Sequence, residues 1–435
     1  MDRLPIVGWR RNADSRPSGS VCMAAPFSRT LGFLTLLLAP IVAVGQSSDT
    51  VKSFYNQHRC FELRDAASGR RLPPLYAGAV ASALSDSKNA EKLLNRAIKM
   101  APDSEVADEA HGQLAYLYAR LSRNRKVVQQ FDRMLQIKPG REELRNARAL
   151  FAAFSRYPDQ SVGKRRFTSV RGAEVSKDGL VIPLSINGKA VNWGIDTGMN
   201  ISIIGDSEAR MLGLTVDNEQ AQVADMNGGT TPVRTTIVNR LAIGEVEVRN
   251  VPFMVLPDSQ PPMNLLPPGK RGYLGLPVVV ALQAISWTAD GTFEIGFPPG
   301  IQDSTRVNLC FDGLAPIVRV QFQGRALEFL FDTGNGAGTQ LWDRFGEEFK
   351  ALLKEHGTKS TKKVTQVGGS IDREATVLPE LRLSIGKFDT VLKPAFIFSK
   401  PVGNDSQYGL FGMDLLSQAR EVKVDFRSMT ILLLP

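Results

Sequence analysis

The stretch Ala190-Val191-Asn192-Trp193-Gly194-Ile195-Asp196-Thr197-Gly198 is an apolar run that ends in an aspartate, a threonine and a glycine. The same ending recurs in Ala326-Leu327-Glu328-Phe329-Leu330-Phe331-Asp332-Thr333-Gly334. Eight residues before each aspartate lies a turn glycine, Gly188 or Gly324, and before it another β-rich run, 181–186 or 315–322. Each copy therefore predicts a hairpin whose second strand carries an aspartate into a glycine turn.

The duplication continues downstream of the triplets. Three further pairs of motifs match, at offsets of 140, 142 and 137 residues against 136 for the triplets: Gly228-Gly229 with Gly368-Gly369, Leu241-Ala242-Ile243-Gly244 with Leu383-Ser384-Ile385-Gly386, and Gly272-Tyr273-Leu274-Gly275 with Gly409-Leu410-Phe411-Gly412. Because the offsets are long and nearly constant, they predict two similar β-rich domains rather than a solenoid of short repeats.

Each unit resembles a lobe of the retropepsin-like aspartic proteases, over residues 176–300 and 305–435. The resemblance implies a mainly β fold, with two pseudo-symmetric acid-protease β-barrel lobes. It also implies roles for single residues: catalysis by Asp196 and Asp332; support of the pair by Thr197, Gly198, Asn200, Thr333 and Gly334; flap flexibility from Gly228, Gly229, Gly368 and Gly369; and structural hydrophobic-hydrophobic-Gly elements ending at Gly275 and Gly412.

The chain departs from the family pattern directly after each triplet. The family often has Ala or Ser there, followed by Ser, Thr or Asp, whereas this chain has Met199-Asn200 and Asn335-Gly336. Asn200 keeps a side-chain donor and Gly336 does not. The expected support of Asp332 is therefore weaker than that of Asp196.

Two carboxyl groups on equivalent turns can share one proton and activate a water molecule. The predicted function is aspartic-type endopeptidase activity on peptide or protein substrates, without a cofactor. No metal site is expected, because His58, His111 and His356 are isolated in the sequence. With both half-sites in one chain, we expect a monomer to be catalytically competent.

Other functions fit the residues less well. The glycines of 334–338 match neither dinucleotide-binding nor Walker spacing, and neither a Gly-x-Ser-x-Gly elbow nor a His-Glu-x-x-His motif is present. The net charge of +9 is spread along the chain, so nucleic acid is not an expected partner. The alternative function is a catalytically weak or inactive peptide-binding protein that retains the retropepsin-like fold.

The N-terminal 45 residues predict a signal peptide region. Residues 31–44 are apolar and are followed by Gly45, after which we expect cleavage, and translation is expected to begin at Met23. Export to the periplasm or the extracellular space follows, with an uncleaved membrane anchor as the alternative. Cys60 and Cys310 then remain, as one disulfide or as two thiols.

Residues 46–160 are expected to be helical. Segments 90–102 and 127–139 are similar, lie 37 residues apart and each end in proline, which resembles tetratricopeptide helix hairpins. This region is interpreted as a docking surface for a protein partner, as a cover for the protease cleft or as a stabilising domain. Residues 161–175 are predicted to be a flexible linker.

Overall fold

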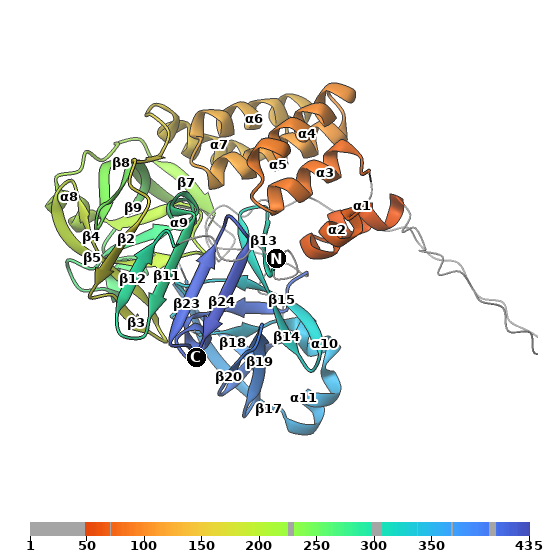
Figure 1. Cartoon of the computed structure of the whole chain (residues 1–435). Helices are drawn as coiled ribbons and strands as arrows, with labels where there is room; N and C mark the ends of the chain where they lie inside the picture. Colours follow the sequence, from red (N-terminus) through yellow and green to blue (C-terminus); the bar gives the residue numbers. More distant parts are fainter. Residues whose placement is uncertain are drawn as a thin grey trace, which may run out of the picture.

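The computed structural model describes residues 48–69, 71–224, 230–297, 307–336, 338–366, 369–399 and 406–435. An all-helical region comes first, and two β lobes of the acid-protease kind follow, which confirms the predicted fold class (Figure 1). The helices of the first region are α1 (Ser48–Asn56), α2 (Cys60–Ala67), α3 (Pro74–Ala83), α4 (Ser87–Met100), α5 (Glu105–Arg120), α6 (Asn124–Ile137) and α7 (Glu142–Ser155).

Local sequence explains where the longer helices begin. The side chain of Asp86 accepts a hydrogen bond from the Asn89 amide at 3.2 Å and caps α4, and Ser104 caps α5 through the Ala107 amide at 3.2 Å. Each helix from α3 to α7 packs against the next one in the chain. The tetratricopeptide resemblance of this array stays a prediction.

The first lobe is built on one sheet with the strand order β1-β9-β6-β10-β5-β4-β8-β7, to which β3 is added beside β4. Its elements are β1 (Ser161–Val162), β3 (Glu174–Ser176), β4 (Gly179–Ile186), β5 (Lys189–Asp196), β6 (Ser202–Gly205), α8 (Asp206–Leu212), β7 (Ala221–Ala224), β8 (Thr230–Ile243), β9 (Val246–Leu256), η1 (Met263–Leu265), β10 (Gly272–Gly275) and α9 (Leu276–Leu282).

The second lobe repeats this plan in the order β17-β18-β21-β16-β22-β15-β14-β19-β20, with β13 beside β14. Its elements are β13 (Leu309–Asp312), β14 (Ala315–Phe322), β15 (Arg325–Phe331), β16 (Gln340–Leu341), α10 (Asp343–Glu348), α11 (Lys350–His356), β17 (Thr358–Gln366), β18 (Gly369–Leu378), β19 (Leu381–Ile385), β20 (Phe388–Leu392), β21 (Ala395–Phe398), β22 (Gly409–Phe411) and α12 (Met413–Leu416).

A third sheet joins the two lobes. Its order is β2-β12-β11-β23-β24, made of β2 (Thr168–Arg171), β11 (Ala284–Thr288), β12 (Thr292–Ile295), β23 (Glu421–Asp425) and β24 (Thr430–Leu434). The junction is the antiparallel pair β11–β23, which runs from Ala284 opposite Asp425 to Thr288 opposite Glu421. Backbone hydrogen bonds therefore connect the lobes on the side shown at the centre of Figure 1.

Both predicted hairpins are present. β4 and β5 are joined by Asn187 and Gly188 at φ +49° and +88°, and β14 and β15 by Gln323 and Gly324 at +50° and +76°. Two successive residues with positive φ make the turn whose twist matches that of the flanking strands. The glycine at the second position of each turn has no side chain to resist that geometry.

The stretch expected to be a flexible linker, 161–175, instead contributes strands to the sheets. β1 pairs with β9, β2 with β12, and β3 with β4. These strands carry almost no signal in the sequence, because each is only two to four residues long and is mostly exposed. The connection between the helices and lobe 1 is thus fixed along much of its length.

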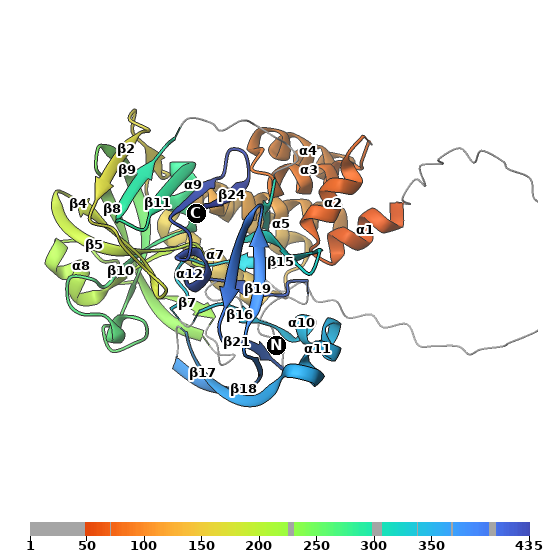
Figure 2. The ribbon, with the colours of Figure 1, turned by 60° about the horizontal axis from the view of Figure 1, so that its bottom comes forward.

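The helical region and lobe 1 share one buried cluster. It combines Leu114, Leu117 and Phe154 of the helices with Met199 and Ile203 of lobe 1. In both views the helices lie against the two lobes, with α7 beside β7 (Figures 1 and 2). The helical region is therefore packed into the same body as the β lobes.

The predicted signal region and the residues Gly228, Gly229 and Gly368 lie outside the described residues. Gly369 is the first residue of β18 and pairs with Gln366 of β17, so it lies in the hairpin expected to be a flap. Among the helices that the structure describes, none is long and apolar enough to cross a membrane.

Candidate active site

The two aspartates occupy matching places in their lobes. Asp196 is the last residue of β5 and lies opposite Gly275 of the parallel strand β10. Asp332 follows β15, and its amide donates to the carbonyl of Phe411, the last residue of β22, at 3.0 Å. Because Gly412 follows Phe411, each aspartate lies beside the glycine that ends a hydrophobic-hydrophobic-Gly element.

The threonines of the triplets hold the two loops together across the lobes. The Thr197 hydroxyl donates to the Phe331 carbonyl at 2.9 Å, and the Thr333 hydroxyl donates to the Ile195 carbonyl at 2.8 Å. Each hydroxyl also accepts from the opposite threonine amide, at 3.1 Å and 3.2 Å. Both threonines are 1% exposed, so these four hydrogen bonds are shielded from competing water.

The triplet glycines allow the two loops to approach closely. A Cβ on Gly334 would lie 2.0 Å from Cγ of Asp196, and a Cβ on Gly198 would lie 2.7 Å from Oδ2 of Asp332. Each glycine also donates its own amide to the aspartate of its own loop, Gly198 to Asp196 at 2.8 Å and Gly334 to Asp332 at 2.9 Å. Any side chain at either glycine would displace the opposite carboxyl group.

The two carboxyl groups are buried and interact with each other. Burial raises the pKa of Asp196 well above 3.8, and the charge of Asp332 and a hydrogen bond with it raise this pKa further. Burial also raises the pKa of Asp332, although its hydrogen bonds with the Gly334 amide, Asp196 and the Asn335 amide oppose the shift. Such a pair keeps one proton to a higher pH than an isolated aspartate would.

Residues that the sequence reasoning missed complete the support. The Ser202 hydroxyl accepts from the Gly275 amide at 3.0 Å, and Thr339 does the same for Gly412 at 3.0 Å. In lobe 2 Asp414 accepts from the Thr339 hydroxyl at 2.6 Å. The only sequence sign of this pair was a hydroxyl residue six or seven positions after the aspartate of each triplet.

Tyr273 is a second residue that sequence reasoning did not single out. Its ring covers Gly194, where a Cβ would lie 2.3 Å from a ring carbon. Burial and then the charge of Asp196 raise the pKa of Tyr273 to about 12, so the phenol stays neutral. It places an aromatic ring and a hydroxyl near Asp196.

The residues after the triplets differ between the lobes, as their sequences do. Asn200 lines a cavity of about 10 Å³ between lobe 1 and the helices, together with Phe151 and Phe154. In lobe 2, Asn335 donates through its side chain to the Gly338 carbonyl at 2.6 Å, and Gly336 is exposed. Over the described residues, no group of three or more His, Cys, Asp or Glu side chains is placed to hold a metal ion.

A comparison with protein families matches residues 182–278 to the aspartyl protease model. This segment begins in β4, contains the first triplet and ends just after Gly275. A comparison with curated proteins finds no match.

Solved structures also match this chain, at low sequence identity. The retropepsin-like aspartic protease from Rickettsia conorii is 15% identical, with a TM-score of 0.24, over 32% of this chain and 97% of its own. The protein titled edgp is 12% identical (TM-score 0.36; 62% and 95% covered), and conglutin gamma, a basic 7S globulin from lupine seeds, is 10% identical (TM-score 0.33; 63% and 94%). Residues 182–278, in the first lobe, are thus similar to the aspartyl protease family.

Proposed function

We propose that the protein is an aspartic-type endopeptidase that hydrolyses peptide bonds through Asp196 and Asp332. The observation that carries the proposal is the pair of buried carboxyl groups. Each accepts a hydrogen bond from the amide of the glycine in its own triplet, and the threonine hydrogen bonds connect the two loops. This arrangement fixes two acids at one point before substrate arrives, which is the preorganisation that catalysis requires.

In the proposed reaction one carboxylate takes a proton from a water molecule while the water oxygen attacks the peptide carbonyl carbon. The protonated partner donates its proton to the carbonyl oxygen, which gives a tetrahedral diol. Collapse of the diol breaks the carbon–nitrogen bond, and a proton passes to the leaving nitrogen. The dyad then holds one proton again, so the cycle closes.

The raised pKa values set the expected pH dependence. Because the reaction needs one shared proton, activity is lost at high pH when the pair gives it up, and the raised pKa values move this limb above the range of an ordinary aspartate. The stability of the fold changes in the same direction. The protonated dyad makes its full contribution to the free energy of unfolding at low pH, and this contribution is lost as the pH rises through the raised folded-state pKa values.

The test is cleavage of a peptide library by the full chain from about pH 3 to 7, with and without a statine-type transition-state mimic. We expect cleavage that the mimic inhibits, and loss of at least about a thousandfold in kcat/KM in Asp196→Asn and in Asp332→Asn. Both variants should unfold at a denaturant midpoint no lower than that of the parent at pH 7, since each removes one of the two buried carboxyl groups whose ionisation is costly. Substantial activity in either variant would overturn the dyad, and peptide binding without cleavage would favour the peptide-binding alternative.

We also propose that the protein is exported, from the apolar segment 31–44. The disulfide between Cys60 and Cys310 supports an oxidising compartment. Cell fractionation followed by N-terminal sequencing tests this: the mature chain should start at Gln46 and be found outside the cytoplasm. A chain that keeps residues 31–44 in a membrane fraction would instead support the anchor.

A further inference from the structure

The surroundings of the dyad have two pseudo-equivalent ends. We define the first end by Met199–Ile201 after the first triplet, the turn Asp312–Leu314 of lobe 2 and the β7–β8 hairpin. The second end consists of the corresponding parts: 335–336, the turn 177–179 of lobe 1 and the β17–β18 hairpin. Each end combines one lobe's post-triplet residues with a turn of the other lobe.

The contacts support this pairing. At the second end, a Cβ on Gly336 would lie 3.3 Å from the carbonyl oxygen of Asp178. At the first end, Leu314 and Met199 belong to the same buried cluster, and Tyr273 packs against that cluster. Turn and post-triplet residues therefore lie close together at the second end and share one buried cluster at the first.

The two ends differ in what covers them. At the first end Met199, Ile201 and Leu314 are only 8%, 5% and 8% exposed, because they pack into the cluster that α5 and α7 complete. At the second end Lys177, Asp178 and Gly336 are exposed. The sequences of the two ends differ, and at the first end the helical region supplies the apolar partners that cover these residues.

Specific bonds place the helices at the turn of the first end. Arg120, at the end of α5 and 3% exposed, donates to the Gly313 carbonyl and lies 4.4 Å from the centroid of the Phe311 ring. Its other nitrogen donates to the Ser82 carbonyl of α3 at 2.8 Å. Burial lowers the pKa of Arg120 to about 9, so it stays charged at neutral pH.

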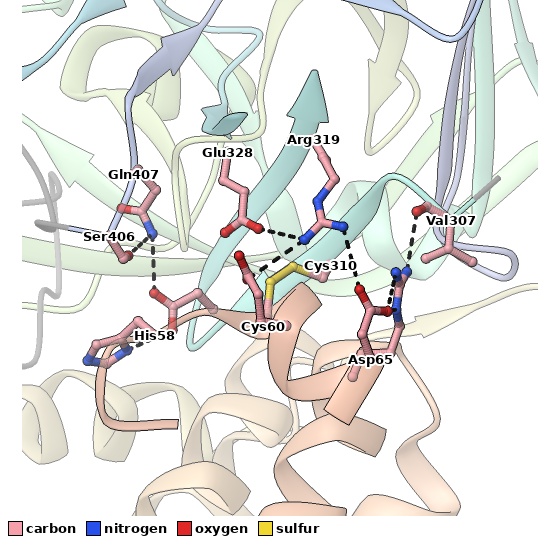
Figure 3. Close-up of a disulfide and its surroundings, with 12 residues drawn as sticks. His58, Cys60, Asp65, Val307, Cys310, Arg319, Glu328, Ser406 and Gln407 are labelled. Atoms are coloured by element: carbon pink, nitrogen blue, oxygen red, sulfur yellow. Dashed lines mark hydrogen bonds and ion pairs between the residues drawn. A yellow bond between two sulfur atoms is a disulfide. The ribbon is translucent and has the colours of Figure 1, made fainter. Parts of the chain in front are cut away.

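The disulfide and polar contacts of Figure 3 fix the same turn from α2 and its preceding loop. Cys60 at the start of α2 is bonded to Cys310 of β13. His58 Nδ1 lies 2.9 Å from Oδ1 of Asp312, whose other oxygen accepts from the Gln407 side chain at 3.4 Å. The cover is therefore attached covalently two residues from the turn.

The hairpin of the first end is also held. Ala221, Val223 and Val233 of β7 and β8 are buried in the shared cluster. Arg156, directly after α7, forms ion pairs with Asp217 and Glu219 before β7. In contrast, residues 358–361 of β17 at the second end are exposed.

We infer that the helical region closes the first end of the peptide-binding site, so that substrate extends freely only past the second end. This inference rests on the proposed function. A peptide running across both triplets would meet α5, α7 and the Asp312–Leu314 turn on one side and solvent on the other. The substrates would then be chains cleaved a few residues from one terminus, with a long extension tolerated on one side of the cut.

The experiment uses the full chain and a peptide that it cleaves, lengthened stepwise with Gly-Ser repeats on either side of the cut. We expect one series to keep kcat/KM within about threefold and the other to fall by at least about tenfold once its stub exceeds a few residues. The side of the cut at which lengthening lowers kcat/KM identifies the direction in which the peptide lies. Equal tolerance of both series, or cuts spread through the middle of a long unfolded protein, would overturn the inference and leave the proposed function intact.

A binding measurement separates the two claims. A statine-type mimic carrying a bulky label at one end or the other is titrated into the full chain by calorimetry, with Asp332→Asn as the control for dyad-dependent binding. The label at the closed end should weaken binding at least about tenfold, and the other label should not. Similar affinity for both labelled mimics would overturn the inference alone. If the protein cleaved no peptide and bound no mimic, the proposed function and this inference would both be overturned.

Discussion

At the scale of single residues, the two threonine hydroxyls each donate one hydrogen bond and accept another across the lobe boundary. Thr197→Val or Thr333→Val keeps the shape but leaves a buried carbonyl and amide unpaired. We expect a loss of about 1–3 kcal/mol in the free energy of unfolding. We also expect at least about a tenfold loss in kcat, because the carboxyl groups lose their alignment.

Urea unfolding and steady-state kinetics on the same samples measure both effects. Thr→Ser at the same position is the matched control, since it keeps the hydroxyl and should recover most of the stability and activity. A valine variant with parent stability would show that the cross-lobe bonds contribute little.

A second residue-scale effect is expected at Glu328, on the strand β15 that leads to Asp332. Burial and then the charge of Glu62 raise its pKa to about 7 from 4.5, despite a hydrogen bond from Arg319 at 3.0 Å. Because the pKa of Glu328 is raised in the folded state, its protonated carboxyl group stabilises the fold fully below about pH 4.5. This contribution is lost as the pH rises to about 7. For this largely buried group the loss is up to about 3 kcal/mol.

Glu328→Gln removes the titration and keeps the shape. The difference in unfolding free energy between variant and parent, measured from about pH 4 to 8, should therefore shift in favour of the variant as pH rises. A difference that does not change with pH would contradict the raised pKa.

At the scale of elements, α2 is tied to β13 by the bond between Cys60 and Cys310, which closes a loop of 250 residues. Cross-links of this kind stabilise by about 2–4 kcal/mol, mainly by restricting the unfolded chain. Reduction should lower the denaturant midpoint of the parent. The midpoint of the double variant Cys60→Ala/Cys310→Ala should not change on reduction. A parent that is insensitive to reductant under conditions shown to reduce the bond would contradict this expectation.

The elements also show what sequence could and could not predict. The dyad hairpins were predictable because a β-rich run, a turn glycine, an apolar run and a triplet lie within twenty residues of each other. The disulfide was left open, and the strands of 161–175 were missed. The two cysteines are 250 residues apart, and β1 and β2 pair with strands far along the chain. Strands of two to four residues also have no measurable period.

At the scale of the whole molecule, the shared cluster changes what is expected of the helical region. One role expected from the sequence was that of a stabilising domain, and the structure favours it, because Met199, Ile203 and Val223 of lobe 1 are buried together with Leu117 and Phe154. A chain starting at Ser169 would expose these side chains to water. At about 25 cal/mol per Å² of apolar surface, the cost is large against a typical stability of about 5–15 kcal/mol.

We therefore expect the 169–435 fragment to be unfolded or aggregated, as judged by dye binding and limited proteolysis. Supplying residues 46–168 as a separate chain is the matched control, because it restores the apolar partner without the covalent connection. A soluble fragment with the parent's protease resistance would show that the lobes are self-sufficient.

The cross-lobe sheet carries a consequence for synthesis. Lobe 1 holds β11 and β12, but their neighbours β23 and β24 are made about 130 residues later, at 421–434. While the chain is emerging from the ribosome, the edge of β11 is unpaired and Asp196 has no partner carboxyl group. The proposed dyad is thus incomplete in the nascent chain until lobe 2 has been made, and the exposed edge of β11 marks that interval as the one in which a chaperone is most needed.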